Sequence, residues 1–180
     1  MKKFFKTAAI VASLSAFSYF LSPVQLPNKI FYKKNPEVYK LQDSTSENIL
    51  VAYRELKNIR MSYGLDTNFV LESSFCAVAQ KFATQLADSS HPISHNMPFN
   101  KFSERALSLS AFRCNLGEAI IFCSNIVPTT KAIKYMIEEL LNSTYHREII
   151  LKTTVDYVGI GVGYNSKDKK LVIVIITGYK

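Results

Sequence analysis

The chain has 180 residues, enough for one ordinary hydrophobic core and too few for two. Its formal net charge is +8, but +3 of this lies in residues 1–18 and another +3 in residues 19–40. Residues 41–180 therefore carry only about +2. This distribution excludes the nucleic-acid-binding class, because such proteins cluster basic residues on the folded domain itself.

The first 18 residues have the pattern of a secretory signal peptide. Three lysines in MKKFFK precede about 15 mostly apolar or small residues, and Ala16-Phe17-Ser18 offers a cleavage site. We therefore expect a secreted or periplasmic protein. In the alternative interpretation, residues 7–23 stay uncleaved as a membrane anchor, although a spanning helix needs about 20 apolar residues. We expect no other contact with a membrane.

A linker or arm is predicted over residues 19–42, which are rich in lysine and proline and show no sustained period. The folded domain is predicted over residues 43–180. Its first helix is expected to begin at a capping box, STSE at residues 44–47, and to end at Gly64 in a left-handed cap.

A second helix is predicted over residues 68–87, from apolar side chains spaced three or four residues apart. A polar stretch follows, in which two prolines exclude regular structure and which carries His91 and His95. The apolar segment NLGEAIIFC, residues 115–123, is predicted to be a strand.

An amphipathic helix is predicted over residues 129–143, and a shorter helix capped by Ser143 follows it. The pattern then changes to period two over residues 156–178, with a polar turn at 165–168, which predicts a β-hairpin. The glycines of GIGVG lie inside a strand rather than between a strand and a helix. They are therefore expected to admit a helix or a ligand close to the sheet and not to bind phosphate.

This order of elements predicts an α+β fold, in which helices pack on an antiparallel sheet in an α-β-α sandwich. The three cysteines allow at most one disulfide. Cys114 and Cys123 bracket a short segment and are plausible partners in an oxidising compartment. Cys76 lies in a helical pattern and is expected to be a small buried side chain.

Three features of the sequence indicate a functional site. His146 falls in the first turn of the short helix, where the helix dipole lowers the pKa of an imidazole and keeps it neutral; the alternative is a surface histidine. Glu118 is the one charged residue of a segment otherwise suited to burial. His91 and His95 lie in a loop that core packing does not need. Arg105 and Arg147 are available to pair with carboxylates, or are simply solvated.

Taken together, these residues resemble the CAP superfamily of secreted proteins, named for cysteine-rich secretory proteins, antigen 5 and plant pathogenesis-related proteins of group one. The bacterial, cysteine-poor branch is the closer likeness, and the resemblance covers residues 46–178. It rests on six segments in the family's order: ELKNIRMSYGL, ESSFCAVAQKFATQLA, SHNMPFNKFSERA, LGEAI, LLNSTYHREIIL and VGIGVGYN.

The resemblance implies an α-β-α sandwich with an open cleft, in which two histidines and two acidic residues converge. His95 matches the first histidine, with His91 in reserve, Glu118 the first acid and His146 the second histidine. The second acid is missing, because Ser143 occupies its place. Glu139, one helical turn earlier, is the reserve. Two further departures are Leu140, in place of a tryptophan, and Ala119, in place of an asparagine.

His95, Glu118 and His146 would still be three ligands, enough for zinc or another divalent cation with an open coordination position. The family resemblance favours a secreted, non-catalytic protein that binds a small apolar ligand such as a lipid or sterol, or a host or envelope partner. No catalytic residue is assigned in that case. The alternative is a metal-assisted hydrolase or peptidase that uses Glu118 and His146. We expect substitution of either residue to cost little stability, because both should line the cleft.

Overall fold

The computed structural model describes residues 8–9 and 43–180. The predicted linker, and the predicted signal peptide apart from residues 8–9, lie outside the described residues. Among the described helices, none is long and apolar enough to cross a membrane. The first helix, α1 (Asp43–Ser62), begins one residue before the predicted capping box, so residues 44–47 lie inside the helix rather than at its cap. It is followed by Gly64, whose φ of 68° is the left-handed conformation predicted for it.

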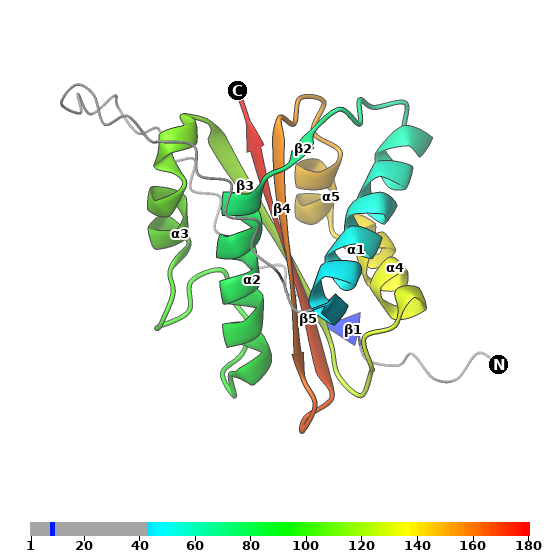
Figure 1. Ribbon diagram of the computed structural model, residues 1–180, viewed down its shortest axis with the longest axis vertical. Helices are drawn as coiled ribbons and strands as arrows, with labels where there is room; N and C mark the ends of the chain where they lie inside the picture. Colours follow the sequence, from blue (N-terminus) through cyan, green and yellow to red (C-terminus); the bar gives the residue numbers. More distant parts are fainter. Residues whose placement is uncertain (1–7, 10–42) are drawn as a thin grey trace.

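A twisted sheet with strand order β1-β3-β5-β4-β2 forms the middle layer of the domain (Figure 1). Its three long strands pair antiparallel, as predicted, with β5 in the centre. The two short edge strands make the sheet mixed, because β2 pairs parallel to β4 while β1 pairs antiparallel to β3. The strands are β1 (Ala8–Ala9), β2 (Val70–Leu71), β3 (Asn115–Cys123), β4 (Tyr157–Asn165) and β5 (Lys170–Tyr179).

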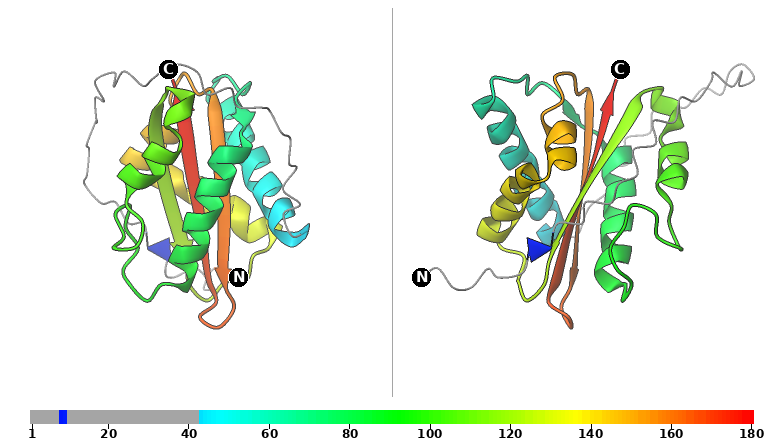
Figure 2. Two further views of the ribbon diagram at one scale, coloured as in Figure 1. Left: turned by 60° about the vertical axis from the view of Figure 1, so that its left-hand side comes forward. Right: turned by 180° about the vertical axis from the view of Figure 1, so that it is seen from behind.

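Helices cover both faces of the sheet, which gives the predicted α-β-α sandwich (Figure 2). One face carries α1, α4 (Thr130–Glu139) and α5 (Thr144–Ile150), and the other carries α2 (Ser73–Asp88) and α3 (Phe102–Ser108). Two short 3-10 turns, η1 (Ser110–Phe112) and η2 (Leu140–Asn142), follow α3 and α4.

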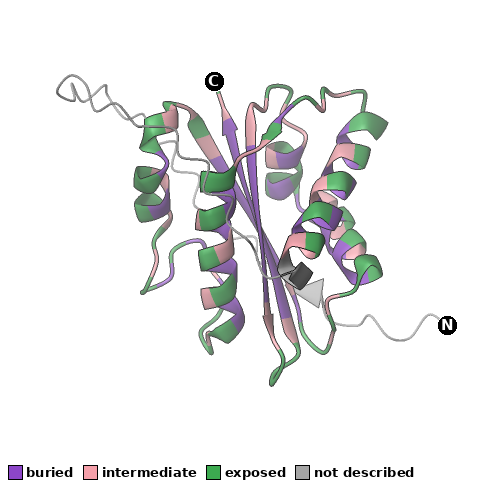
Figure 3. Ribbon diagram, in the orientation of Figure 1, coloured by how far each residue is buried: buried purple, intermediate pink, exposed green. Residues whose placement is uncertain are grey.

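The central strand β5 is buried on both sides (Figure 3). Leu171, Ile173 and Ile175 pack toward α1, α4 and α5, whereas Val172 and Val174 pack toward α2. A strand that is covered on both faces needs apolar residues at every position. This explains why the second half of the predicted hairpin reads as an uninterrupted apolar run.

Three alternate glycines of β4 let α2 lie directly against the strand. A Cβ atom added to Gly161 would lie 2.2 Å from the carbonyl carbon of Ala79, and Gly159 and Gly163 would meet the α2 backbone just as closely. The glycines of GIGVG therefore serve close helix packing, one of the two roles predicted for them.

Two predicted elements differ from the structure. The second helix begins at Ser73 rather than residue 68, because the segment before it pairs with β4 as β2. The stretch expected to lack regular structure, residues 89–105, contains the first four residues of α3, a seven-residue helix. Cys114 and Cys123 cannot form the disulfide considered above, because they lie at opposite ends of β3, about 30 Å apart along an extended strand.

Candidate functional site

The predicted site residues come from three parts of the fold that meet at β3. His95 lies in the loop between α2 and α3, Glu118 lies on β3, and His146 lies on α5. Figure 2 shows α3 and α5 on opposite sides of β3, so the helix after the His95 loop and the helix that carries His146 cover different faces of the sheet. Their ring centroids are 6.3 Å apart.

Glu118 is buried in an ion pair with Arg105 of α3. The Arg105 Nε donates to Glu118 Oε2 at 2.7 Å, and Nη2 donates to Glu118 Oε1. The two side chains are 3% and 1% exposed, so this charge pair is almost completely removed from water. Of the two arginines considered as carboxylate partners, Arg105 is paired, whereas Arg147 is exposed on α5 and reaches only a backbone carbonyl.

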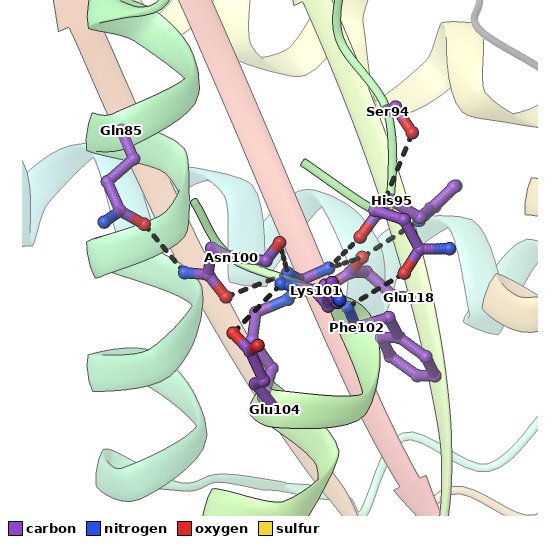
Figure 4. A network of polar contacts seen from close by, with 10 residues as sticks. Gln85, Ser94, His95, Asn100, Lys101, Phe102, Glu104 and Glu118 are labelled. Atoms are coloured by element: carbon purple, nitrogen blue, oxygen red, sulfur yellow. Dashed lines mark hydrogen bonds and ion pairs between the residues drawn. The ribbon is translucent and has the colours of Figure 1, made fainter. Parts of the chain in front are cut away.

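Arg105 also fixes the loop that carries His95. Its Nη2 donates to the His95 carbonyl at 2.8 Å, and its Nη1 donates to the Asn100 carbonyl at 2.8 Å. Its guanidinium stacks 3.5 Å from the ring centroid of Phe82, on α2. Figure 4 shows the network continuing from Asn100 to Gln85 on α2. One arginine thereby connects α2, α3, β3 and the histidine loop.

The His95 imidazole is oriented by Glu118. Its Nδ1 lies 2.9 Å from Glu118 Oε1. Because that carboxylate oxygen also accepts from Arg105, it acts as an acceptor, and the His95 Nδ1 is the donor. In the neutral ring, this leaves the Nε2 atom with a lone pair free to bind a ligand. Both oxygens of Glu118 accept hydrogen bonds, Oε1 from His95 and Arg105 and Oε2 from Arg105.

His146 is completely buried, and neither of its ring nitrogens has a hydrogen-bond partner in the described structure. The alternative of a surface histidine is therefore wrong. Burial lowers the pKa of His146 to about 4, and the nearby His95 contributes to the decrease. The predicted direction is confirmed, but the main cause is loss of solvent rather than the helix dipole. Ser143 caps α5 as predicted, by accepting from the His146 amide at 3.5 Å.

Tyr145 is a part of the site that the sequence did not reveal. Its ring centroid lies 6.1 Å from that of His95 and 5.8 Å from that of His146, so the three rings form a nearly equilateral triangle. Burial, Glu118 and Tyr179 raise the pKa of its phenol. The sequence alone does not indicate that a tyrosine next to a candidate histidine belongs to a site, because exposed aromatic residues are common on helices.

The two reserve residues do not join the site. His91 is exposed beside Ser89, in a shallow hollow at the end of α2 that lies away from β3. Glu139 accepts a hydrogen bond from Asn142 at 3.0 Å, and it makes no hydrogen bond to His146, since that ring has none. His91 therefore does not take the place of His95, and Glu139 does not replace the missing second acid.

Among the described residues of the site, only the imidazoles of His95 and His146 are placed to be ligands of a divalent cation. No three histidine, cysteine, aspartate or glutamate side chains within residues 43–180 are placed to share an ion, so the structure differs from the expected three-ligand set at Glu118. His95 and His146 supply nitrogen donors suited to zinc. Glu118 would hold the ring of His95 from behind, as carboxylates commonly do at metal-bound histidines. Metal binding stays a prediction.

The profile of the cysteine-rich secretory protein family, CAP, matches residues 53–178. The chain belongs to the CAP family. The match includes all the residues of the site described above, and it confirms the resemblance found in the sequence. No curated protein matches this CAP chain significantly.

Solved structures of bacterial proteins share this CAP fold. An outer surface protein from Borrelia burgdorferi is 19% identical, with a TM-score of 0.59, over 74% of this chain and 93% of that one. An extracellular SCP-domain protein from Bacillus anthracis is 18% identical, with a TM-score of 0.55, over 76% of this chain and 41% of that one. A cysteine-rich secretory protein from Staphylococcus aureus is 14% identical, with a TM-score of 0.55, over 78% of this chain and 40% of that one. At these identities the likeness shows the fold alone.

Proposed function

We propose that this CAP protein acts outside the cytoplasm by binding rather than by catalysis, at the cleft of His95, Glu118 and His146. The observation that carries the proposal is the state of Glu118, whose two carboxylate oxygens are occupied by Arg105 and His95. A general base needs a free lone pair within reach of the proton that it removes. Three of the roughly four lone-pair sites of the Glu118 carboxylate are taken, two by Arg105 and one by His95. The side chain is also only 1% exposed, so a substrate has little access to it and its main role is to hold the site together.

Export is supported by the predicted signal peptide and by the relatives with known structures. The matched protein of Borrelia burgdorferi is an outer surface protein, and that of Bacillus anthracis is extracellular. The described residues include no helix that could span a membrane. We place this chain in the same class of secreted or periplasmic proteins.

A divalent cation, zinc above all, is the small ligand to which the cleft is best suited. The Nε2 atom of His95 is directed away from Glu118, and His146 is neutral at physiological pH because its pKa is about 4. Neutral imidazole nitrogens are the ligands that zinc prefers together with thiolates. A bound ion would supply a positive charge with open positions for water or for an acidic group of a partner.

The partner that we propose is a host or envelope protein, or a small apolar ligand. The hollow of about 440 Å³ beside the end of α2 does not discriminate between these two classes, because none of His95, Glu118 and His146 lines it. The alternative of a metal-assisted hydrolase loses support for the reason given above for Glu118.

Calorimetric titration of zinc into the purified chain tests the proposal. We expect saturable binding by the wild type, loss of binding in His146→Leu, which keeps the volume of the buried side chain, and unchanged binding in the control His91→Ala. Binding that survives in His146→Leu, or that disappears in His91→Ala, would contradict the assigned site. Zinc-dependent hydrolysis of peptides or esters by the wild type, abolished by His146→Leu, would restore the hydrolase alternative.

A further inference from the structure

Tyr145 lies beside both histidines and reaches the surface. His146 is 0% exposed and His95 is 8% exposed, whereas Tyr145, whose ring lies against both, is 37% exposed. Tyr145 therefore flanks an approach to both imidazoles from the surface. Among the described residues, Tyr145 is the aromatic side chain whose ring contacts both histidines.

The contacts of Tyr145 permit its ring to move. Its hydroxyl makes no hydrogen bond to a residue of the described structure, in contrast to that of Tyr53, which donates to the Phe69 carbonyl at 2.9 Å. Exposed side chains without such an anchor change rotamer within picoseconds to nanoseconds. By comparison, the other flank of the site is fixed, since Arg105 holds both Glu118 and the backbone at His95.

We propose that Tyr145 is the gate of the histidine pair and controls which ligands reach His95 and His146. In the position seen here, its ring lies beside both imidazoles, and a rotation of the side chain would open the way to them. The gate excludes large ligands from the imidazoles unless it opens. This inference rests on the proposed binding function, because a gate has a role only if a ligand binds to the histidines. The experiment below measures access to the histidines directly and does not require that function.

Chemical modification of the three histidines tests the gate without any metal. Diethyl pyrocarbonate acylates neutral imidazoles, and peptide mapping by mass spectrometry gives a separate rate for each histidine. At neutral pH the protonation of His146 does not limit its rate, because its pKa is about 4. His91 is exposed and serves as an internal reference in every sample.

In the wild type we expect His95 and His146 to react about 10- to 1,000-fold more slowly than His91, as for a site that is open for about 0.1–10% of the time. Tyr145→Ala should remove most of this protection. Tyr145→Phe, which keeps the ring, should preserve it, and so should Tyr63→Ala, which removes an exposed tyrosine at the far end of α1. Circular dichroism would show that each variant is folded.

Two results would overturn the proposal. One is modification of His146 in the wild type as fast as that of His91. This result can be observed without any variant. The other is unchanged protection in folded Tyr145→Ala. The modification experiment contains no metal, so its result is independent of the zinc titration. Faster modification of His95 and His146 in Tyr145→Ala, together with a negative zinc titration of the wild type, would support the gate and refute the metal site.

Discussion

Arg105 and Glu118 form a buried ion pair, in which one guanidinium donates to both oxygens of the carboxylate. The pair joins a short helix to an edge of the sheet, and His95 completes the set of contacts to the carboxylate. This relationship reverses the expectation that Glu118 lines an open cleft and can be replaced at little cost.

Glu118→Gln should destabilise the fold. The substitution leaves the Arg105 guanidinium buried without its countercharge, and breaking such a pair costs about 3–5 kcal/mol. Urea denaturation gives the free energy of unfolding, with Glu138→Gln, an exposed acid on α4, as the matched control. The double variant Glu118→Leu, Arg105→Met should lose less than the sum of the two single changes. A loss below about 1 kcal/mol in Glu118→Gln would show that the pair is dispensable.

At His146, the size of the replacement should matter more than the loss of the ring nitrogens. His146→Leu should stay within about 1 kcal/mol of the wild type, because neither nitrogen has a hydrogen bond to lose. His146→Ala should cost about 2–3 kcal/mol, because it opens a cavity beside α5. Denaturant unfolding of the two variants separates these effects. Equal losses would mean that the ring nitrogens have partners after all.

Acid should destabilise the wild type through His146. The pKa of this ring is about 4 in the folded chain and about 6.5 in an unfolded one. Between these values the unfolded state binds more protons, so stability falls as the pH decreases from about 6.5 to 4, by about 3 kcal/mol in total. Above pH 6.5 this residue causes no change.

The contribution of His146 to acid unfolding can be separated from that of the carboxylates. His146→Leu lacks the titrating ring but retains Glu118 and every other acid. Its free energy of unfolding should therefore depend less steeply on pH between 6.5 and 4 than that of the wild type. Parallel curves for the two proteins would show that His146 does not stay neutral in the fold.

Gly161→Ala should be among the most damaging single substitutions in the chain. The added Cβ would lie 2.2 Å from the backbone of α2, which cannot yield without moving the helix. We expect loss of more than about 3 kcal/mol, the scale of severe core changes. Gly64→Ala is the control, because its added Cβ meets nothing within 4 Å. It should lower the free energy of unfolding by only about 1–2 kcal/mol, the cost of a positive φ for alanine. Similar thermal shifts in the two variants would contradict close packing at β4.

The sequence predicted the elements whose pattern repeats over many residues. The period of α4 and the alternation of β4 are properties of local segments, and both appear as expected. By contrast, α3 is seven residues long and buries only Arg105, which leaves no apolar period to detect. The parallel pairing of β2 was missed because two residues carry no measurable pattern.

The sequence predicted that three segments come together, but not the contacts that their side chains make. The family's segments placed His95, Glu118 and His146 together, and the structure does bring them to β3. Which partner satisfies Glu118 depends on a contact between residues 13 positions apart on different elements, and no local pattern determines it. The position of Tyr145 likewise follows from how α5 lies against the histidine loop.

The backbone contact between α2 and the glycines of β4 has a mechanical consequence. Because no side-chain layer lies between them, there is nothing that can repack to let the helix slide, and helix and strand must behave as one rigid body. The histidine loop begins at the end of this body and is tied back to it by Arg105 through Phe82. Adaptation to a ligand must therefore come from the opposite flank of the domain, where α5 meets the edge of the sheet.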